Sequence, residues 1–302
     1  MESYLERKRP AILISLFCMA LWGSAIPLIK TTYRLMGITS GDTGAKLLVA
    51  GIRFCFAGLI GLGYYALLNR GQQKKQANYR YICVLSLLQT TLQYIFYYIG
   101  LSNTTGVKAS IIQSSNAFFI VIISAMVMKS EHLTGRRLLS LLVGTIGIIF
   151  ANLHGGTSLS FHFRGEGFIL IAALFNAMAT VFVRKYGKNE DAALSTGIQF
   201  FLGSLPLLGL GLILCKQWPE FSFVAILMLV YGGFVSATAF TLWSMVLRHQ
   251  SSGEFGMYRL FIPIFGSLFS VIFLKETFYF SLLVGLTLVL LGSLILNLPQ
   301  KK

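Results

Sequence analysis

The chain has 302 residues, of which 55% are hydrophobic and only 12% are charged. This composition leaves too little polar surface for a soluble globular protein of this length. The formal net charge is +15, but the basic residues lie between apolar segments, which argues against a nucleic-acid-binding surface. The composition therefore indicates a membrane protein.

Ten apolar segments follow one another along the chain, each close to the roughly 20 residues that a helix needs to cross a bilayer. The first follows a basic stretch, but it is too long for a secretion signal and nine more come after it, so we interpret it as an uncleaved helix. The sequence therefore predicts an all-α polytopic membrane protein. The ten predicted spans are 11–35, 45–69, 80–101, 108–129, 135–153, 166–186, 193–215, 222–247, 252–274 and 278–298.

Basic residues are unequally distributed between the two sides of these spans. With the amino terminus in the cytoplasm, 16 of the 25 Lys and Arg residues fall on the inner side, seven on the outer side and two within spans. Cytoplasmic loops carry an excess of Lys and Arg. We therefore expect a multi-pass protein of the cytoplasmic membrane with both termini in the cytoplasm.

The second half of the chain repeats the first. Residues 97–153, moved forward by 145 positions, overlay 242–298 without a gap. Each half carries five spans, an odd number, so the second half is expected to insert upside down relative to the first. Inverted repeats are typical of secondary transporters, whose substrate site lies near the midplane between the halves. We predict ten transmembrane helices as two inverted five-helix repeats, 1–155 and 156–302, in one membrane-embedded unit.

Several short motifs occur in a characteristic order along nearly the whole chain. They are Trp22-Gly23 with Lys30 eight residues beyond Trp22, Arg53-Phe54, Gly100-Leu101, Ala109-Ser110, Pro263 thirteen residues before Glu276, and Glu131 and Glu276 themselves. In this order the chain resembles the EamA-type branch of the drug/metabolite transporter superfamily. The resemblance implies ten helices in two repeats and the export or uptake of a small metabolite. The sequence departs from the family at Phe118, where a proline is common.

Arg259 is the strongest single candidate for a functional residue, because it lies near the centre of the ninth span. A charged side chain there costs roughly 2.5–3.5 kcal/mol on insertion scales, so it should face a wet cavity or a partner. Pro263 cannot donate to the carbonyl of Arg259, which predicts a kink and a free carbonyl at this depth. The alternative is an arginine paired internally to hold helices together. Glu254, near the cytoplasmic end, is expected to be solvated, with proton coupling as a speculative role.

Polar side chains also concentrate in the third and fourth spans. Gln89, Gln93 and Tyr97 follow at i, i+4 and i+8, which on an α-helix places them on one face. The repeat places Gln113 opposite Tyr258. Such amides either join helices to one another or line a shared cavity, and tryptophans could add aromatic walls. The predicted substrate site comprises Arg259, Tyr258, Gln113, Asn116, Gln89, Gln93, Tyr97, Trp22 and Trp243.

Two further features leave alternatives open. Arg53, in the second span, is close enough to the outer interface that a structural and a functional role are equally supported. Small residues seven positions apart predict close packing of the fifth and tenth helices, with a homodimer as the alternative. These small residues are Ser140, Gly147, Gly285 and Gly292.

We interpret the chain as a secondary transporter that moves a small, amino-acid-like or other carboxylate-bearing metabolite by alternating access. A guanidinium pairs with a carboxylate through two parallel hydrogen bonds, which favours such a substrate. One alternative is efflux of lipophilic cations bound on aromatic ring faces, although no carboxylate lies at a span centre. Another is a membrane sensor or scaffold without transport.

Enzymatic activity is not expected from this sequence. The four histidines fall in loops or at span ends, and the four cysteines show no metal-binding spacing. A glycine-rich phosphate-binding loop is missing, so ATP is not the expected energy source. We expect no cofactor, metal or nucleic acid, and name the small-molecule substrate and the lipid bilayer as partners.

Overall fold

The described secondary structure consists of helices alone. The computed structural model describes residues 5–39, 41–68, 77–103, 112–113, 115–128, 134–152, 162–275 and 280–297, and no strand occurs in these ranges. The boundary predicted between the halves, at residue 155, lies outside them. The helices are α2 (Lys8–Leu35), α3 (Thr43–Leu68), α4 (Tyr79–Ser86), the π-helix η1 (Leu87–Leu92), α5 (Gln93–Ser102), α7 (Ser115–Val127), α8 (Gly135–Asn152), the π-helix η2 (Phe163–Gly167), α9 (Phe168–Tyr186), α10 (Ala192–Leu214), α11 (Phe223–His249), α12 (Ser252–Phe255), the 3-10 helix η3 (Gly256–Phe261), α13 (Ile262–Leu274) and α14 (Phe280–Asn297).

Seven helical stretches of the described residues are long and apolar enough to cross a membrane. They correspond to the first, second, third and sixth to ninth predicted spans. The described parts of the other three, in α7, α8 and α14, are 13, 18 and 18 residues long. The protein is therefore an all-helical, multi-pass membrane protein, and ten complete crossings stay a prediction.

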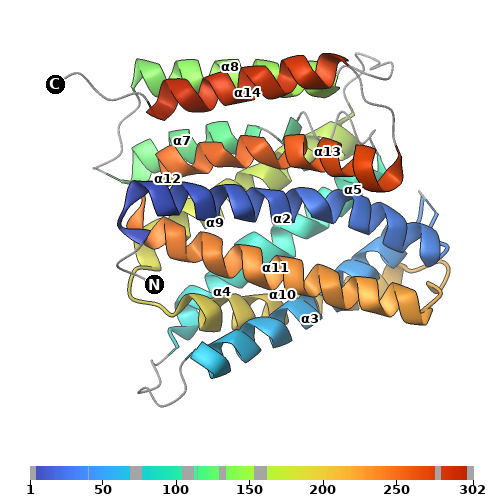
Figure 1. Ribbon diagram of the computed structural model, residues 1–302. Helices are drawn as coiled ribbons and strands as arrows, with labels where there is room; N and C mark the ends of the chain where they lie inside the picture. The colour runs from blue at the N-terminus through green and yellow to red at the C-terminus, as the bar shows by residue number, and fades with distance from the viewer. Residues whose placement is uncertain are drawn as a thin grey trace.

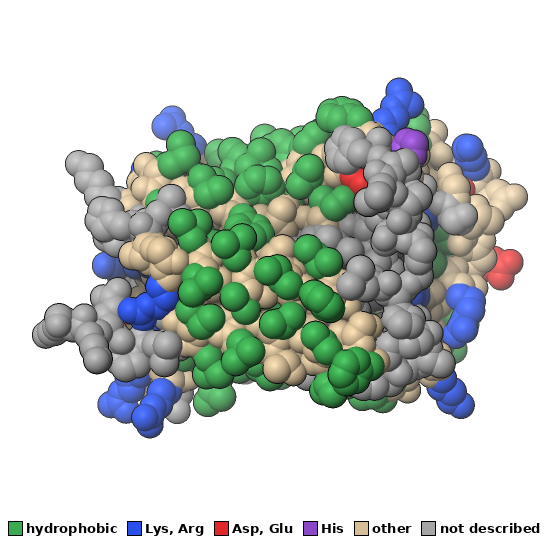
Figure 2. Space-filling view, turned by 90° about the horizontal axis from the view of Figure 1, so that it is seen from above, with side chains coloured by type: hydrophobic (Ala, Val, Ile, Leu, Met, Phe, Trp, Pro, Cys, Tyr) green, Lys and Arg blue, Asp and Glu red, His purple; other side chains and the backbone are tan. Residues whose placement is uncertain are grey.

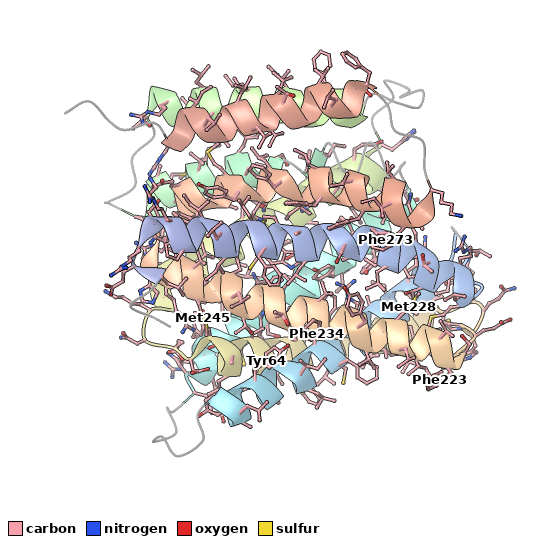
Figure 3. The ribbon with its side chains drawn as sticks, viewed as in Figure 1. Tyr64, Phe223, Met228, Phe234, Met245 and Phe273 are labelled. Carbon is pink, nitrogen blue, oxygen red and sulfur yellow. The ribbon has the colours of Figure 1, made fainter. Side chains whose placement is uncertain are left out.

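The outer surface is apolar between two charged ends. Figure 2 shows hydrophobic side chains across the middle of the face that α8 and α14 form, with lysines and arginines gathered at both ends. Phe223, Phe234 and Phe273, labelled in Figure 3, are exposed by 75%, 43% and 68%. Lipid tails accept such side chains, whereas water would penalise a continuous apolar band of this kind.

Two helix pairs join corresponding helices of the predicted halves. α3 packs against α10, and α8 packs against α14 at the top of Figure 1. A Cβ atom at Gly61 of α3 would lie 2.8 Å from the Cα of Gly197 in α10, so only glycine permits this approach. The close contact brings the two backbones together.

Small residues also account for the contact between α8 and α14. The hydroxyl of Ser140 donates a hydrogen bond to the carbonyl of Gly292. A Cβ atom at Gly147 would lie 2.8 Å from the carbonyl oxygen of Gly285. The predicted close packing of these small residues is confirmed, and the contact is made within one chain.

The first helix of each predicted half packs between two helices of the other half. α2 contacts α11 and α13, whereas α9 contacts α5 and α7. The start of α2 and the end of α14 lie at the same end of the molecule (Figure 1). These contacts bring α2, α5, α7, α11 and the start of α13 around the centre of the protein.

Asp42 fixes the start of α3 to the segment that follows α10. Its Oδ1 accepts a hydrogen bond from the N–H of Ala45 at 2.9 Å, and its Oδ2 accepts from the N–H groups of Lys216 at 3.2 Å and Gln217 at 3.1 Å. Burial favours the protonated carboxyl, but the three N–H donors outweigh burial and hold the pKa of Asp42 below its ordinary value. Asp42 thus caps one helix and anchors a second segment.

Two of the spans are interrupted where they reach the centre. The π-helix η1 lies between α4 and α5, and the 3-10 helix η3 lies between α12 and α13. Such departures from α-helical geometry often mark functional positions or strained sequences. Both interruptions adjoin the cavity described next.

Candidate functional site

A cavity of about 190 Å³ lies among α2, α3, α5, α7, α11 and the junction of η3 with α13. Its wall combines two arginines, three amides and a group of aromatic rings with a few aliphatic side chains. Pockets that bind small molecules have this mixture of an apolar lining and a few polar groups. The polar and aromatic lining residues are Arg53, Arg259, Gln93, Gln113, Asn116, Trp22, Tyr94, Tyr97, Tyr98 and Phe240.

Arg259 lies beside two indole rings that contact each other. Its guanidinium carbon is 4.8 Å from the ring centroid of Trp22 and 5.8 Å from that of Trp243. The two indoles are themselves 5.9 Å apart in an edge-to-face arrangement. Within the described chain, the buried Nη1 of Arg259 has no hydrogen-bond acceptor. The rings attract the cation through their faces, and at least one of its N–H donor groups makes no hydrogen bond within the described chain.

The backbone around Arg259 differs from the sequence expectation in one respect. Pro263 lies in the first turn of α13, where its missing N–H is tolerated. The carbonyl of Arg259 is not free, because the N–H of Ile262 donates to it. The prediction of a free carbonyl was therefore wrong, since the 3-10 geometry of η3 supplies a donor one residue earlier than an α-helix would.

Arg53 of α3 is a second cation in the same cavity wall. Its side chain is only 7% exposed, and its Nη2 donates a hydrogen bond to the Oγ of Ser236 at 2.9 Å. The guanidinium carbon lies 5.3 Å from the ring centroid of Phe54. The Nε of Arg53 is buried without an acceptor among the described residues. The sequence left the role of this residue open, and the structure places it at the cavity.

A chain of amides connects three helices behind the cavity. The Nδ2 of Asn176 in α9 donates to the Oε1 of Gln93 at 2.7 Å. The Nδ2 of Asn116 in α7 donates to the Oδ1 of Asn176 at 3.1 Å and to the carbonyl of Ala173 at 2.8 Å. Gln93 and Asn116 therefore both line the cavity and join helices. Sequence reasoning missed Asn176, whose only signal was one amide within an apolar span.

Three tyrosines of α5 form an aromatic side of the cavity. Tyr94 lies 6.4 Å from Tyr97 and 6.1 Å from Tyr98, measured between ring centroids, and Tyr97 lies 5.7 Å from Tyr98. Tyr94 also contacts Phe54 at 4.4 Å, which connects this side to α3. Only Tyr97 was predicted, although Tyr94 precedes it by three residues and this spacing places both on one face of an α-helix.

The structure brings together most of the predicted site residues, but two lie elsewhere. Six of them line the cavity: Trp22, Gln93, Tyr97, Gln113, Asn116 and Arg259. Trp243 is not part of the lining but contacts Arg259, which is. Gln89 is buried within η1 and is not part of the lining. The π-turn changes the rotation per residue, so that Gln89 and Gln93 no longer share the face that an α-helix would give them. Tyr258 packs instead between Phe255 and Phe261, at 5.4 Å and 6.3 Å.

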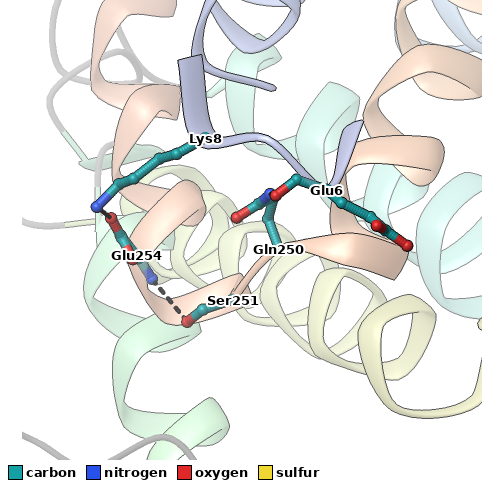
Figure 4. A network of polar contacts seen from close by, with 5 residues as sticks. All are labelled: Glu6, Lys8, Gln250, Ser251 and Glu254. Carbon is teal, nitrogen blue, oxygen red and sulfur yellow. Dashed lines mark hydrogen bonds and ion pairs between the residues drawn. The ribbon is translucent and has the colours of Figure 1, made fainter. Parts of the chain in front are cut away.

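Glu254 lies at the end of the molecule where α2 begins. Its Oε1 forms an ion pair with the Nζ of Lys8 at 2.5 Å, and its N–H donates to the Oγ of Ser251 (Figure 4). In the same network, the Nε2 of Gln250 donates to the carbonyl of Leu5 at 2.8 Å. These contacts join the amino-terminal segment to α12. Glu254 is not among the residues that line the cavity.

The described cavity wall carries positive charge without a compensating acid. The charged residues of the described lining are Arg53 and Arg259, and none of the described lining residues is Asp or Glu. The described residues also contain no group of His, Cys, Asp and Glu that could hold a metal ion. The chemistry of the wall therefore suits an anionic group that can accept hydrogen bonds from guanidinium N–H donors.

Comparisons with known proteins agree in pointing to one family. The sequence profile of the EamA-like transporter family matches the chain twice, at residues 9–153 and 163–298. The WAT1-related protein At3g02690, chloroplastic, of Arabidopsis thaliana is 25% identical over 299 residues, which cover 96% of this chain and 69% of that protein. The uncharacterized transporter YvbV of Bacillus subtilis is 26% identical and covers 98% of this chain and 94% of its own length. The uncharacterized transporter sll0355 of Synechocystis sp. is 25% identical, with coverages of 92% and 86%.

A solved crystal structure shares the fold of the whole chain. It aligns with a TM-score of 0.78 at 18% sequence identity, over 97% of this chain and 98% of the other. The all-helical architecture described above is therefore one that an experimentally determined protein also adopts.

Proposed function

The chain belongs to the EamA-like transporter family, and on this premise we propose that it is a secondary transporter of a small, carboxylate-bearing metabolite, amino-acid-like compounds included. It moves its substrate across the cytoplasmic membrane by alternating access, with both termini in the cytoplasm. One observation carries the choice of substrate. The guanidinium of Arg259 lies against the rings of Trp22 and Trp243 and lines the cavity, where the described lining residues include no acid.

The helix contacts support two inverted five-helix repeats. Exchanging the two predicted halves turns the contacts of α2 with α11 and α13 into those of α9 with α5 and α7. The same exchange leaves the pairs α3–α10 and α8–α14 unchanged. A pseudo-two-fold axis that relates the halves would produce this pattern, and in such transporters the substrate site lies between the repeats.

The positive wall favours an acid over the alternative substrate, a lipophilic cation. The aromatic rings could hold a cation through their faces, but the guanidinium of Arg259 already occupies the faces of Trp22 and Trp243. A second cation would also be repelled by the two arginines. A carboxylate gains two parallel hydrogen bonds from a guanidinium instead.

Uptake into vesicles tests the proposal directly. The purified protein is reconstituted and screened with amino acids, other organic acids and amines, with and without a pH gradient. We expect saturable uptake of carboxylates. The substitution Arg259→Ala should lower this uptake at least tenfold, because a hydrogen bond to a charged group contributes about 1.5–3 kcal/mol. Arg259→Lys should restore only part of it, since an ammonium lacks the planar fork.

The matched control is Arg80→Ala, which removes an exposed arginine of α4 outside the cavity. All variants are compared for membrane insertion and monodispersity. Normal uptake by the Arg259→Ala protein would remove Arg259 from the site, and saturable uptake of amines alone would overturn the substrate class. Ligand-dependent thermal stabilisation without any uptake would indicate the sensor or scaffold instead.

A further inference from the structure

Two separate guanidinium groups line the cavity, although a single carboxylate can neutralise only one. Arg259 is held by Trp22 and Trp243, whereas Arg53 is held by Phe54 and the hydroxyl of Ser236. Because the two arginines have different neighbours on different helices, they occupy separate places in the wall. Each is fixed in position before a substrate arrives.

Neither arginine uses all of its N–H donors within the described part of the chain. The Nη1 of Arg259 and the Nε of Arg53 are buried and have no acceptor within the described part of the chain. The ion pair between Lys8 and Glu254 involves neither arginine. A buried charge without a partner is costly, so a ligand that supplies two anions would neutralise both cations.

We propose that the cavity binds two carboxylates of one substrate at once, one on Arg259 and one on Arg53, so that the preferred substrate is a dicarboxylate. This inference rests on the proposed function and narrows its substrate class. A neutral amino acid or a monocarboxylate would leave Arg53 uncompensated.

Arg53 lies at the side of the cavity that continues toward the end of α2. It also lines a smaller cavity with Thr32, Tyr33 and Met228, which Arg259 does not reach. A carboxylate bound by Arg53 would therefore lie at this side of the cavity. Arg53 is therefore the residue that determines specificity, while Arg259 binds the carboxylate common to all substrates.

Competition between matched acids tests the inference. Succinate and butyrate have the same number of carbons and differ by one carboxylate, and L-aspartate and L-alanine form a second pair with an amino group. Each acid is titrated against the protein in detergent, with the fluorescence of Trp22 and Trp243 as the readout. A Trp218→Phe background removes the third tryptophan, which is 69% exposed. The same acids then compete for uptake in vesicles.

We expect the second carboxylate to strengthen binding roughly 10- to 100-fold in both pairs. Arg53→Gln should reduce this advantage to less than threefold, because only an acid with a second carboxylate loses the contact with Arg53. Arg259→Gln should weaken all four acids. Arg53→Lys keeps the charge but loses the planar guanidinium, so it should show an intermediate preference for the dicarboxylate. It replaces Arg53→Gln if the Arg53→Gln protein is not monodisperse. Arg80→Gln is the control.

Each outcome decides between the two proposals. If succinate and butyrate bind equally and binding still depends on Arg259, the preference for dicarboxylates is refuted. The proposal that the protein transports carboxylates is then unaffected. If both Arg53 variants still prefer succinate as strongly as the wild type does, the role of Arg53 in binding a second carboxylate is refuted as well. Phosphate that competes as strongly as succinate would show that the site takes one compact anion. Acid binding by the Arg259→Gln protein at wild-type strength would refute the proposed function itself.

Discussion

The amide of Asn176 should contribute measurably to both stability and substrate binding. Asn176 is fully buried and bonds to two cavity residues, Gln93 at 2.7 Å and Asn116 at 3.1 Å. Asn176→Leu keeps a side chain of similar size but removes both bonds. Side-chain hydrogen bonds between membrane helices contribute about 0.6 kcal/mol each and at most about 1.7. A buried acceptor left without a donor, here the Oε1 of Gln93, adds roughly 1–3 kcal/mol.

The free energy of unfolding should therefore fall by about 1–3 kcal/mol in the Asn176→Leu protein. It is measured by equilibrium unfolding in mixed micelles, with tryptophan fluorescence as the signal. Substrate affinity should fall as well, because Gln93 and Asn116 lose the partner that orients them toward the cavity.

Gln199 provides the matched control for this substitution. It is also a buried amide, only 1% exposed, but neither its oxygen nor its nitrogen has a partner in the described residues. Gln199→Leu should therefore be neutral or stabilising, because it removes a buried polar group that makes no hydrogen bond. If the Asn176→Leu protein is as stable as the wild type, or if both substitutions destabilise equally, the amide chain does not hold the helices.

Three further predictions concern the ends of the molecule. The depressed pKa of Asp42 means that its stabilisation is fully present above the unfolded value of about 4 and is lost as the pH falls through the lower folded value. Thermal unfolding of the wild type should therefore be more acid-sensitive between pH 5 and pH 3 than that of Asp42→Asn, and equal sensitivity would contradict the capping contacts. Lys8→Ala should change stability by less than about 1 kcal/mol, because Lys8 is half exposed and an ion pair at the protein surface contributes little. A coupling role for Glu254 predicts that Glu254→Gln, but not Lys8→Ala, removes the stimulation of uptake by a pH gradient.

Much of the fold is predictable because a bilayer imposes simple constraints on a sequence. Apolar segments of about 20 residues indicate helices without any knowledge of their neighbours. Ser140 and Gly147 predict close packing because their size alone allows helices to approach. Arg259 is identifiable for a similar reason, since a charge within an apolar span requires an explanation.

The remainder of the site depends on contacts that no single segment contains. Trp22 and Trp243 are each weak candidates, and only the packing of α2 against α11 places both beside Arg259. Asn176 has no recognisable partner until α9 meets α5 and α7. Gln89 was misplaced because its position was inferred from α-helical spacing, whereas the chain forms a π-turn there.

The backbone contact between Gly61 and Gly197 limits which parts of the protein can rearrange. No flexible side chain separates α3 from α10 at this crossing, so neither helix can slide without a collision of main-chain atoms. The two helices are expected to move as one rigid body during transport. Rearrangement during transport is therefore expected away from this crossing, and Arg53, which α3 carries, is expected to keep its position relative to α10.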